Sequence, residues 1–492
     1  MTRRLTFNLG FRYDLFTQPV DALNTGGVFD PYGMSRLGRL GVIRRPAQDG
    51  YSRAIVKGHH KNLAPRFGFA FQATRKFVIR SGYGMFYSQR EQNRQVTDIA
   101  NSLTNFRIIT SPQVIPETTV RPPIRFTSPL TVEAALDPDF SRYNARNPLG
   151  TAFLAADIGN SRFPMLQQFN FSLQYEFVPG LLVEASYAGA RGIRWVQRIN
   201  VNTVRFEDAL AGKNTQADRP FPFVQESIGW DTAIVNNWYH SFNLRVERRL
   251  SQGLTLLANY TVSKNIDSGG SGNSLFDQQG DTRALEAYNL KLERGISPTD
   301  IPQKFVLSAL YDLPFGPGKR FLSQPGIAGH LLGGWQVNGI LMLRGGFPSD
   351  LRVARLAPVF NTANRPNRVL GEPLLVPNPG FDQYFNPKAF AVPPTVPNFR
   401  GAPTQTLGNA GRSILRGPGL SNLDLSAFKD IRTSETTKLE FRAEAFNVSN
   451  TPSFELSGAR TAALTVGDPA FGKLTGAQTV GRQIQFGLKF LW

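Results

Sequence analysis

Apolar and polar residues alternate at every second position in many segments of this 492-residue chain. Between residues 169 and 177 the odd positions are large and apolar, namely Phe169, Phe171, Leu173, Tyr175 and Phe177. The even positions between them are Asn, Ser, Gln and Glu. Because successive side chains of a strand point to opposite faces, this segment predicts a β-strand with one apolar face and one polar face.

The same alternation recurs in about twelve segments, most of them near the ~10 residues that a tilted membrane strand requires. They are residues 4–13, 66–72, 77–87, 168–177, 181–187, 241–250, 254–262, 305–313, 335–343, 422–427, 438–445 and 483–492. A strand that meets lipid on one side and water on the other needs this pattern. We therefore predict an all-β fold, an antiparallel transmembrane outer-membrane β-barrel.

The final segment carries the strongest form of the pattern, because the chain ends on an aromatic residue with no polar tail. One face of this segment is wholly apolar, with Ile484, Phe486, Leu488, Phe490 and Trp492. A soluble protein rarely places five large apolar groups on one face of its last strand. We expect this segment to be the closing strand of the barrel.

The lengths of the connections support this prediction. Short turns are expected at 73–75, 178–180, 251–253 and 429–436, and a somewhat longer one contains the turn-rich segment 314–318. Between them lie long connections, with about 50 residues after Tyr13 and about 80 after Tyr87 and Leu343, far above ordinary loop lengths. Outer-membrane barrels alternate in this way because their periplasmic turns are tight and their extracellular loops are free to grow.

Composition agrees with a membrane barrel. The chain has no cysteine, which excludes disulfides, thiolate metal sites and cysteine nucleophiles. No apolar run reaches the ~18 residues of a membrane helix, and the nearest, 331–343, is interrupted by glycines and Gln336. No linker or change in composition divides the chain, so we treat residues 1–492 as one domain. A soluble array of β-sandwiches would explain the alternation, but not the aromatic terminus or the alternating connections.

Four further segments resemble a known family. They are NLAPRFGFA at 62–70, IPQKFVLS at 301–308, GGWQVNGI at 333–340 and EFRAEAFNVSN at 440–450. Their order and spacing resemble the barrel of Oar-like TonB-dependent receptors over nearly the whole chain. The resemblance implies a signal peptide, a small β-domain, a plug inside the barrel and about 22 strands, the size class of plugged outer-membrane transporters.

This sequence begins within a strand and shows neither an apolar signal core nor a plug. We therefore expect it to be the C-terminal part of such a receptor, either a fragment or a gene with a misplaced start. TonB would act through an N-terminal plug region that is missing here. With about twelve strands, we expect an incomplete part of a larger barrel, either an open half-barrel or a strained closure of the first strand onto the last. The barrel-assembly machinery is expected to engage the terminal strand.

The net charge of +19 would suggest nucleic acid on a soluble protein, but we expect no nucleic-acid partner here. Many basic residues lie in expected outward loops, namely Arg36, Arg39, Arg44, Arg45, Arg53 and Lys57. Lipopolysaccharide phosphates beside the outer-membrane lipid are a natural counter-charge, and solvated basic loops are an equal alternative. On the polar face, Arg80, Arg245 and Arg442 are expected to balance Glu247, Glu440 and Glu444 rather than bind substrate.

Candidate catalytic and metal-binding residues are few. His59 and His60 are an adjacent pair without further ligands, and the spacing of Asp267 and Asp281 does not match a calcium loop, so we expect a flexible loop there. Gly318-Lys319-Arg320 lacks the remainder of a phosphate-binding loop, and the glycosylation triplet at Asn447 means little in a bacterial outer membrane. We expect no catalytic residue, no metal site and no cofactor.

Three functions remain open. The favoured one is a receptor and transporter of the Gram-negative outer membrane that binds an unknown ligand through its extracellular loops for TonB-dependent uptake. Iron chelates, oligosaccharides and peptides all fit basic loops that contain aromatic residues. An alternative is a barrel enzyme of the phospholipase type, whose Ser–His pair could be Ser241 with His240, which is expected at a strand end. A structural or adhesive barrel is the third.

Overall fold

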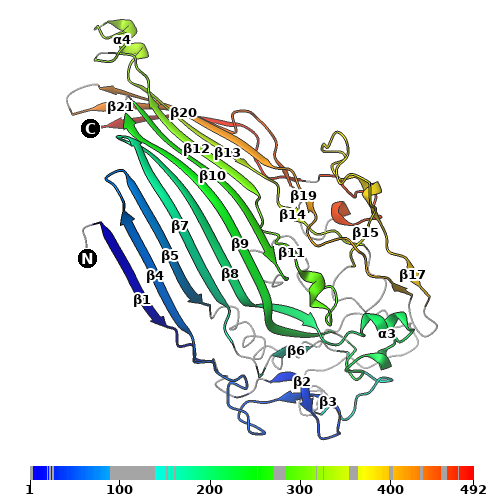
Figure 1. The fold of residues 1–492 in the computed structure, drawn as a ribbon. Coiled ribbons are helices and arrows are strands. Elements are labelled where there is room, and N and C mark those ends of the chain that lie inside the picture. Colours follow the sequence, from blue (N-terminus) through cyan, green and yellow to red (C-terminus); the bar gives the residue numbers. More distant parts are fainter. Residues whose placement is uncertain are drawn as a thin grey trace.

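Twelve strands of the chain form one curved antiparallel sheet in chain order in the computed structural model (Figure 1). The structure describes residues 4–18, 20, 24, 27–88, 139–150, 153–156, 158–159, 162–225, 227–251, 253–269, 284–316, 318–324, 326–353, 364–397, 403–432, 436–455, 462–474 and 476–492. All strands that the alternation predicts are present, and a single sheet excludes the β-sandwich alternative.

Each of the twelve strands pairs antiparallel with the next. They are β1 (Leu5–Tyr13), β4 (Leu63–Gln72), β5 (Phe77–Tyr87), β7 (Met165–Val178), β8 (Leu181–Asn200), β9 (Ile228–Ser251), β10 (Leu254–Asp267), β12 (Gln303–Asp312), β13 (Trp335–Arg344), β20 (Leu420–Arg432), β21 (Lys438–Phe446) and β24 (Gln483–Leu491). The five short turns lie at one end of the sheet and the long connections at the other, as predicted. The turn between β7 and β8 closes on Gly180, whose φ of +80° favours glycine.

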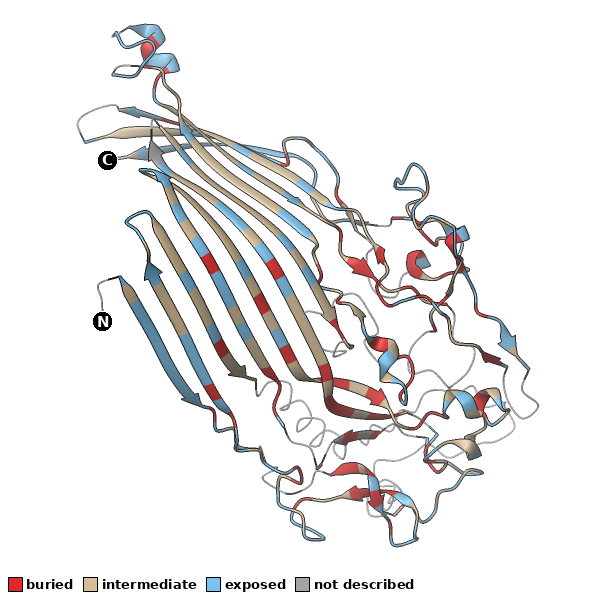
Figure 2. Cartoon of the chain, in the orientation of Figure 1, coloured by how far each residue is buried: buried red, intermediate tan, exposed pale blue. Residues whose placement is uncertain are grey.

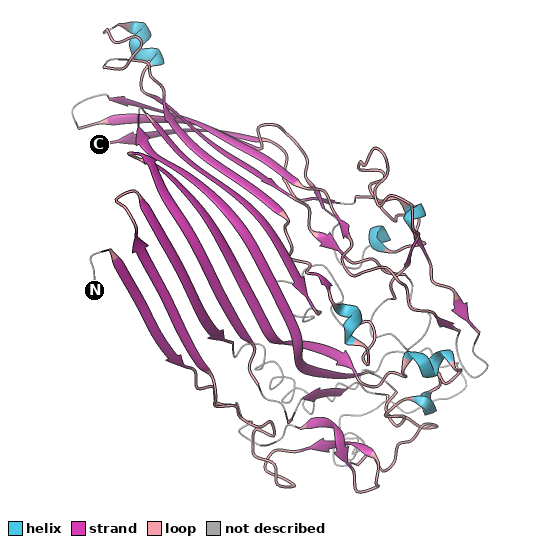
Figure 3. Ribbon diagram, viewed as in Figure 1, coloured by secondary structure: helices cyan, strands magenta, loops and turns pink. Residues whose placement is uncertain are grey.

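Smaller elements lie within the connections (Figure 3). Short strands are β2 (Val28–Met34), β3 (Leu40–Arg44), β6 (Phe153–Ala156), β11 (Gly295–Ile296), β14 (Pro348–Ser349), β15 (Asn367–Arg368), β16 (Phe390–Ala391), β17 (Thr395–Val396), β18 (Thr404–Gln405), β19 (Leu415–Arg416), β22 (Phe454–Glu455) and β23 (Gly476–Ala477). The helices are α3 (Phe206–Leu210) and α4 (Ile327–Leu332), with 3₁₀ turns at Gln216–Asp218, Leu290–Glu293, Pro387–Ala389 and Ala462–Leu464. No helix in the described part of the chain is long and apolar enough to cross a membrane.

The strand registers place the apolar positions of all twelve strands on one face. Phe169 of β7 lies opposite Tyr83 of β5 and Gly189 of β8, and Tyr187 of β8 lies opposite Phe242 of β9. A side chain at position 189 would clash with the Phe169 ring, so glycine makes room for it. The sheet therefore presents a continuous apolar surface, which we call the lipid face.

Many large side chains of the lipid face are exposed, among them Leu173 at 37% and Leu9 at 80%. A continuous exposed apolar surface of this kind requires a non-aqueous surrounding. The opposite, polar face also carries some aromatic residues. The ring of Phe86 lies 4.6 Å from the guanidinium of Arg66, and the ring of Phe428 lies 5.5 Å from that of Arg442. These cation–π contacts explain why apolar rings occur at these two positions.

The sheet is open. Among the described strands, β1 pairs only with β4, and β24 pairs only with β21. Figure 1 shows β1 at one edge of the curved sheet and the C-terminal strands at the other. Of the two expected arrangements, the open half-barrel is therefore the one observed.

Two strands are much longer than the alternation predicts. β8 has 20 residues and β9 has 24, whereas a tilted membrane strand needs about 9–11. The additional residues lie at the end of the long connections, where β6 adds to β9 in parallel. Ile228, Ala233 and Val235 are buried there, so protein covers this extension on both sides and the simple alternation ends.

Candidate functional site in the outward lobes and the polar face

Several charged side chains of the polar face pair with one another. Arg245 donates to Glu247 over 2.7 Å, and Arg442 pairs with Glu440, as predicted. The prediction was wrong for Arg80, whose partner is the amide oxygen of Gln174 rather than a carboxylate.

The third predicted carboxylate also has an uncharged partner. Glu444 accepts a 2.5 Å hydrogen bond from Gln485 of the terminal strand. The contact links the polar sides of β21 and β24, the last two strands of the sheet. The three arginines and three glutamates named here therefore contact one another or nearby amides.

A cavity of about 800 Å³ lies on the polar face near the short turns. Its lining includes Asp312, Gln336, Asp430, Glu440 and Arg442, which come from β12, β13, β20 and β21. Gln336 donates to Asp312 over 2.7 Å, and Lys438 donates to Asp430 over 2.8 Å. The sequence did not predict this cavity, because its residues come from two hairpins, β12–β13 and β20–β21, that a long connection separates.

The described parts of the long connections fold into lobes at the other end of the sheet. The first, which we call the N-terminal lobe, joins described residues from 27–62, 139–156 and 201–228 around an aromatic core. The core consists of Phe29, Ile43, Phe140, Phe153, Ala155, Phe221, Phe223, Val224 and Ile228. The rings of Phe29 and Phe221 pack edge to face at 5.2 Å. Such contacts stabilise the lobe beyond the burial of apolar area alone.

Basic residues of the N-terminal lobe hold this structure together. The Arg39 guanidinium lies 4.5 Å over the Phe223 ring and donates to backbone carbonyls near residue 140. Arg44 pairs with Asp30 at 3.1 Å, and Arg53 donates to Asn24 over 2.9 Å. At least three of the six cations considered for lipopolysaccharide therefore have protein partners. This favours a structural role for these three residues.

The C-terminal lobe joins the described parts of connections 345–419 and 447–482. Its apolar core consists of Leu351, Val353, Phe385, Ala389, Phe390, Leu415, Ala463, Leu464, Val466, Phe471 and Leu474. A buried hydrogen bond of 3.2 Å from Asn214 to Thr404 links this lobe to the N-terminal one. The outward surface is therefore continuous across residues almost 200 positions apart in the sequence.

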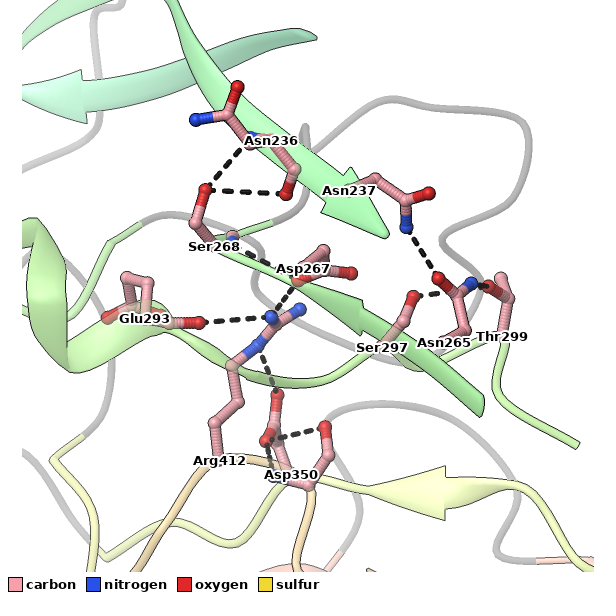
Figure 4. Close-up of polar contacts among 12 residues, drawn as sticks. Asn236, Asn237, Asn265, Asp267, Ser268, Glu293, Ser297, Thr299, Asp350 and Arg412 are labelled. Carbon is pink, nitrogen blue, oxygen red and sulfur yellow. Dashed lines mark hydrogen bonds and ion pairs between the residues drawn. The ribbon is translucent and has the colours of Figure 1, made fainter. Parts of the chain in front are cut away.

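Buried ion pairs join the C-terminal lobe to the sheet (Figure 4). Arg412 contacts Asp267 at the end of β10, and it lies 3.8 Å from Asp350 and 3.2 Å from the Glu293 carbonyl oxygen. Two further pairs, Arg365 with Glu293 and Arg416 with Asp300, connect the same segments. We call these seven residues the Arg412 network.

Burial and charge act in opposite directions on Arg412, which is 6% exposed. Burial lowers its pKa, but Asp267 and Asp350 more than offset this, so the pKa lies above its usual value. Arg412 therefore stays charged and links the two connections. Hydrogen bonds from Asn236 to Ser268 and from Asn237 to Asn265 hold the end of β10 against β9.

We expect Arg412→Met to open the C-terminal lobe, because the variant leaves the buried Asp267 without a cation. Breaking such a pair costs about 3–5 kcal/mol. Hydrogen exchange of residues 284–302 and 345–353 measures the opening. As a control, Arg245→Met removes an ion pair whose arginine is 44% exposed, and it should cost at most about 1 kcal/mol. Equal effects of the two variants would show that the network does not hold the lobe.

The expected absence of a metal site meets no contrary finding among the described residues, where no group of three metal-ligating side chains occurs. Burial lowers the pKa of His59, and the nearby cations Arg194 and Arg162 lower it further. A cationic surrounding opposes metal binding. Asp267 pairs with Arg412 and not with a metal ion. Asp281 lies outside the described residues.

The Ser–His pair of the enzyme alternative is not assembled. His240 lies well inside β9, not at a strand end as expected, and accepts or donates a 2.5 Å hydrogen bond with Tyr187 on the lipid face. Ser241 points to the opposite face and donates to the Ala188 carbonyl. Adjacent strand residues cannot share a face. The pair was placed wrongly because β9 is longer than its alternation indicates.

Two other motifs have structural roles. Asn447, which follows β21, has a φ of +49° and is 4% exposed. Its side chain bonds to Val480 and twice to Thr451, so it closes a turn. Residues 318–320 lie in the connection between β12 and β13, at the end of the short turns.

The terminal strand lies at the sheet edge with its apolar side chains exposed. Within β24, Phe486 is 72% and Leu488 is 68% exposed, with Ile484 and Phe490 on the same face, and Trp492 follows at 90%. Phe441 of β21 stacks on Phe486 at 6.4 Å. The strand therefore extends the lipid face to the edge of the sheet.

Solved structures with a similar fold are outer-membrane transporters and receptors at low sequence identity. The outer membrane transporter YddB from Escherichia coli has 11% identity and a TM-score of 0.43, covering 92% of this chain and 42% of its own. The pyoverdine outer membrane receptor FpvA from Pseudomonas aeruginosa PAO1 has 8% identity and a TM-score of 0.43, covering 100% and 40%. The FrpB iron transporter from Neisseria meningitidis has 12% identity and a TM-score of 0.40, covering 100% and 43%.

The chain thus spans about two-fifths of the length of these proteins. No curated protein sequence matches it. A family model described as "Outer membrane beta barrel domain" matches residues 1–485, almost the whole chain. Together with the single sheet and its lipid face, this match identifies the chain as a member of the outer membrane beta barrel domain family, located in the Gram-negative outer membrane.

Proposed function

We propose that residues 1–492 are the C-terminal part of one receptor-type barrel domain that binds a ligand through its outward lobes for TonB-dependent uptake. The observation that carries the proposal is the packing of the described outward residues into two lobes. Two lobes with apolar cores lie at the outward end of a sheet that has one polar face, and the Arg412 network joins the C-terminal lobe to this sheet. The resemblance to Oar-like receptors at residues 62–70 and 440–450 supports the same function.

The packed cores of the two lobes favour ligand binding. A surface that is already ordered loses less conformational entropy when a ligand binds than a flexible loop does. Iron chelates, oligosaccharides and peptides all remain candidate ligands. TonB-dependent uptake is proposed for the complete receptor, of which residues 1–492 would be the C-terminal part.

Uptake of labelled candidate ligands by cells that produce the complete receptor tests this proposal. We expect binding at the cell surface to persist after a protonophore collapses the proton gradient, while uptake stops. Energy-independent entry would contradict TonB dependence. Hydrolysis of phospholipid by the refolded protein would instead support the enzyme alternative.

We also propose two partners for the sheet itself. The barrel-assembly machinery engages the terminal strand, whose apolar residues Ile484, Phe486, Leu488, Phe490 and Trp492 lie at the open edge. Lipopolysaccharide phosphates contact those basic residues of the outward lobes that have no role inside them. Loss of membrane assembly after removal of Phe490 to Trp492 tests the first of these proposals.

A further inference from the structure

One connection at the short-turn end carries an unexpected set of exposed apolar side chains. It joins β12 to β13 and contains α4, which projects beyond the end of the sheet in Figure 1. Its exposed apolar residues are Phe321 at 48%, Leu322 at 41%, Ile327 at 81%, Leu331 at 64% and Leu332 at 55%. Figure 2 shows this helix as almost wholly exposed, and the only buried residue within it is Gly329.

The C-terminal end of α4 is fixed to the lipid face of the sheet. Trp335, at the start of β13, donates a 3.0 Å hydrogen bond from its indole to the Leu331 carbonyl. Lys429 of β20 donates two 2.6 Å hydrogen bonds, one to His330 and one to Leu331. These bonds satisfy carbonyl groups that a helix end leaves without partners.

Both anchoring side chains belong to the lipid face. Trp335 and Lys429 lie directly opposite each other in the β13–β20 register, two positions before the lipid-face pair Val337 and Ala427. The Trp335 ring packs edge to face against Phe441 of the same face at 6.0 Å. The helix is therefore joined to the side of the wall that meets lipid, at the level where barrels carry their interfacial aromatic residues.

The charges of the connection fit a phospholipid surface. Arg320 precedes the helix, and its guanidinium lies 5.4 Å over the Phe321 ring. Interfacial segments combine apolar side chains that enter the acyl boundary with cations that meet anionic headgroups. A helix of six residues is too short to be stable in water by itself, and the membrane surface would stabilise it.

We propose that residues 320–324 and 326–332 form a membrane-surface anchor on the periplasmic leaflet of the outer membrane. Phe321, Leu322, Ile327, Leu331 and Leu332 enter the boundary between headgroups and acyl chains. Trp335 and Lys429 hold the helix against the wall. The anchor depends on the lipid-face assignment and is independent of the ligand or of TonB.

Spin labels at single cysteines test this anchor in a chain extended upstream so that β1 is paired, because residues 1–492 contain no native cysteine. The positions are Ile327→Cys and Leu331→Cys, whose side chains are exposed and tolerate a label. Arg75→Cys is the matched control, in the tight turn between β4 and β5 at the same end of the sheet. Inserted protein is isolated by flotation with phosphatidylethanolamine–phosphatidylglycerol vesicles. A label at Leu173→Cys, on the lipid face of β7, shows that the isolated protein spans the membrane.

The readout is the ratio of collision rates with oxygen, which concentrates in lipid, and with a water-soluble nickel chelate. We expect this ratio to be several-fold higher at positions 327 and 331 than at position 75. Ratios at 327 and 331 equal to that at 75 would overturn the anchor and leave this helix to a periplasmic protein. Ratios that rise only in vesicles containing phosphatidylglycerol would assign the binding to the anionic headgroups and support the charge argument.

Discussion

Residues 1–492 expressed alone should fail to form a heat-modifiable, protease-resistant barrel in membranes, and should aggregate. Both edges of the sheet are open, since β1 and β24 each have one paired neighbour. Each edge strand has nine residues and presents unpaired backbone N–H and C=O groups. In lipid, each such group costs several kcal/mol, and in water it is a template for pairing with another chain.

The comparison is a chain extended upstream by strands that pair with β1. We expect this longer chain to migrate faster before heating than after heating, as closed barrels do. The lipid-face positions of β1, such as Leu9, should then be shielded by the membrane. A stable barrel from residues 1–492 alone would contradict the prediction. It would indicate that β1 closes onto β24, and it would support the alternative hypothesis of a complete small barrel with enzyme activity.

Arginine at the centre of the lipid face should be strongly destabilising. Leu173 lies in the middle of β7 with its side chain on the lipid face. Leu173→Arg should therefore lower the free energy of unfolding by about 2–4 kcal/mol if residue 173 lies at mid-bilayer depth. Urea unfolding of the membrane-inserted chain that is extended upstream measures this change.

The control for Leu173→Arg is a neighbour on the polar face. Sequence alone suggests Ser172, but this residue is only 8% exposed and lies opposite Arg80, so an arginine there would meet a like charge. Asn170 is exposed and lies between Gly82 and Ala188, which leaves space. Asn170→Arg should be far milder than Leu173→Arg. Equal costs would show that the two faces have been assigned wrongly.

The sheet could be predicted from the sequence because its main determinant is local. A membrane strand needs an apolar residue at every second position, so β7 is visible from Phe169 to Phe177 without any knowledge of its neighbours. The order of the strands followed from the alternating short and long connections. The same information could not give the length of β8 and β9, because their outward parts are buried by loops and no longer alternate.

The outward lobes could not be predicted for a different reason. Arg412 and Asp267 are 145 residues apart, and no periodicity marks either of them. The aromatic core of the N-terminal lobe likewise joins Phe29, Phe140 and Phe223 from three connections. Such contacts depend on how the sheet brings the connections together. The sequence indicated long basic loops, but not that Arg39 and Arg44 would be used inside them.

Spin-label accessibility along β7 tests the central claim most directly. The claim is that the twelve strands cross the outer membrane with one face in lipid and the other in water. Single cysteines from position 168 to 177, in the membrane-inserted chain that is extended upstream, should show a two-residue period. Odd positions should collide preferentially with oxygen, and even positions with a water-soluble nickel chelate. An absence of this period, or preferential access of the chelate on both faces, would contradict the account.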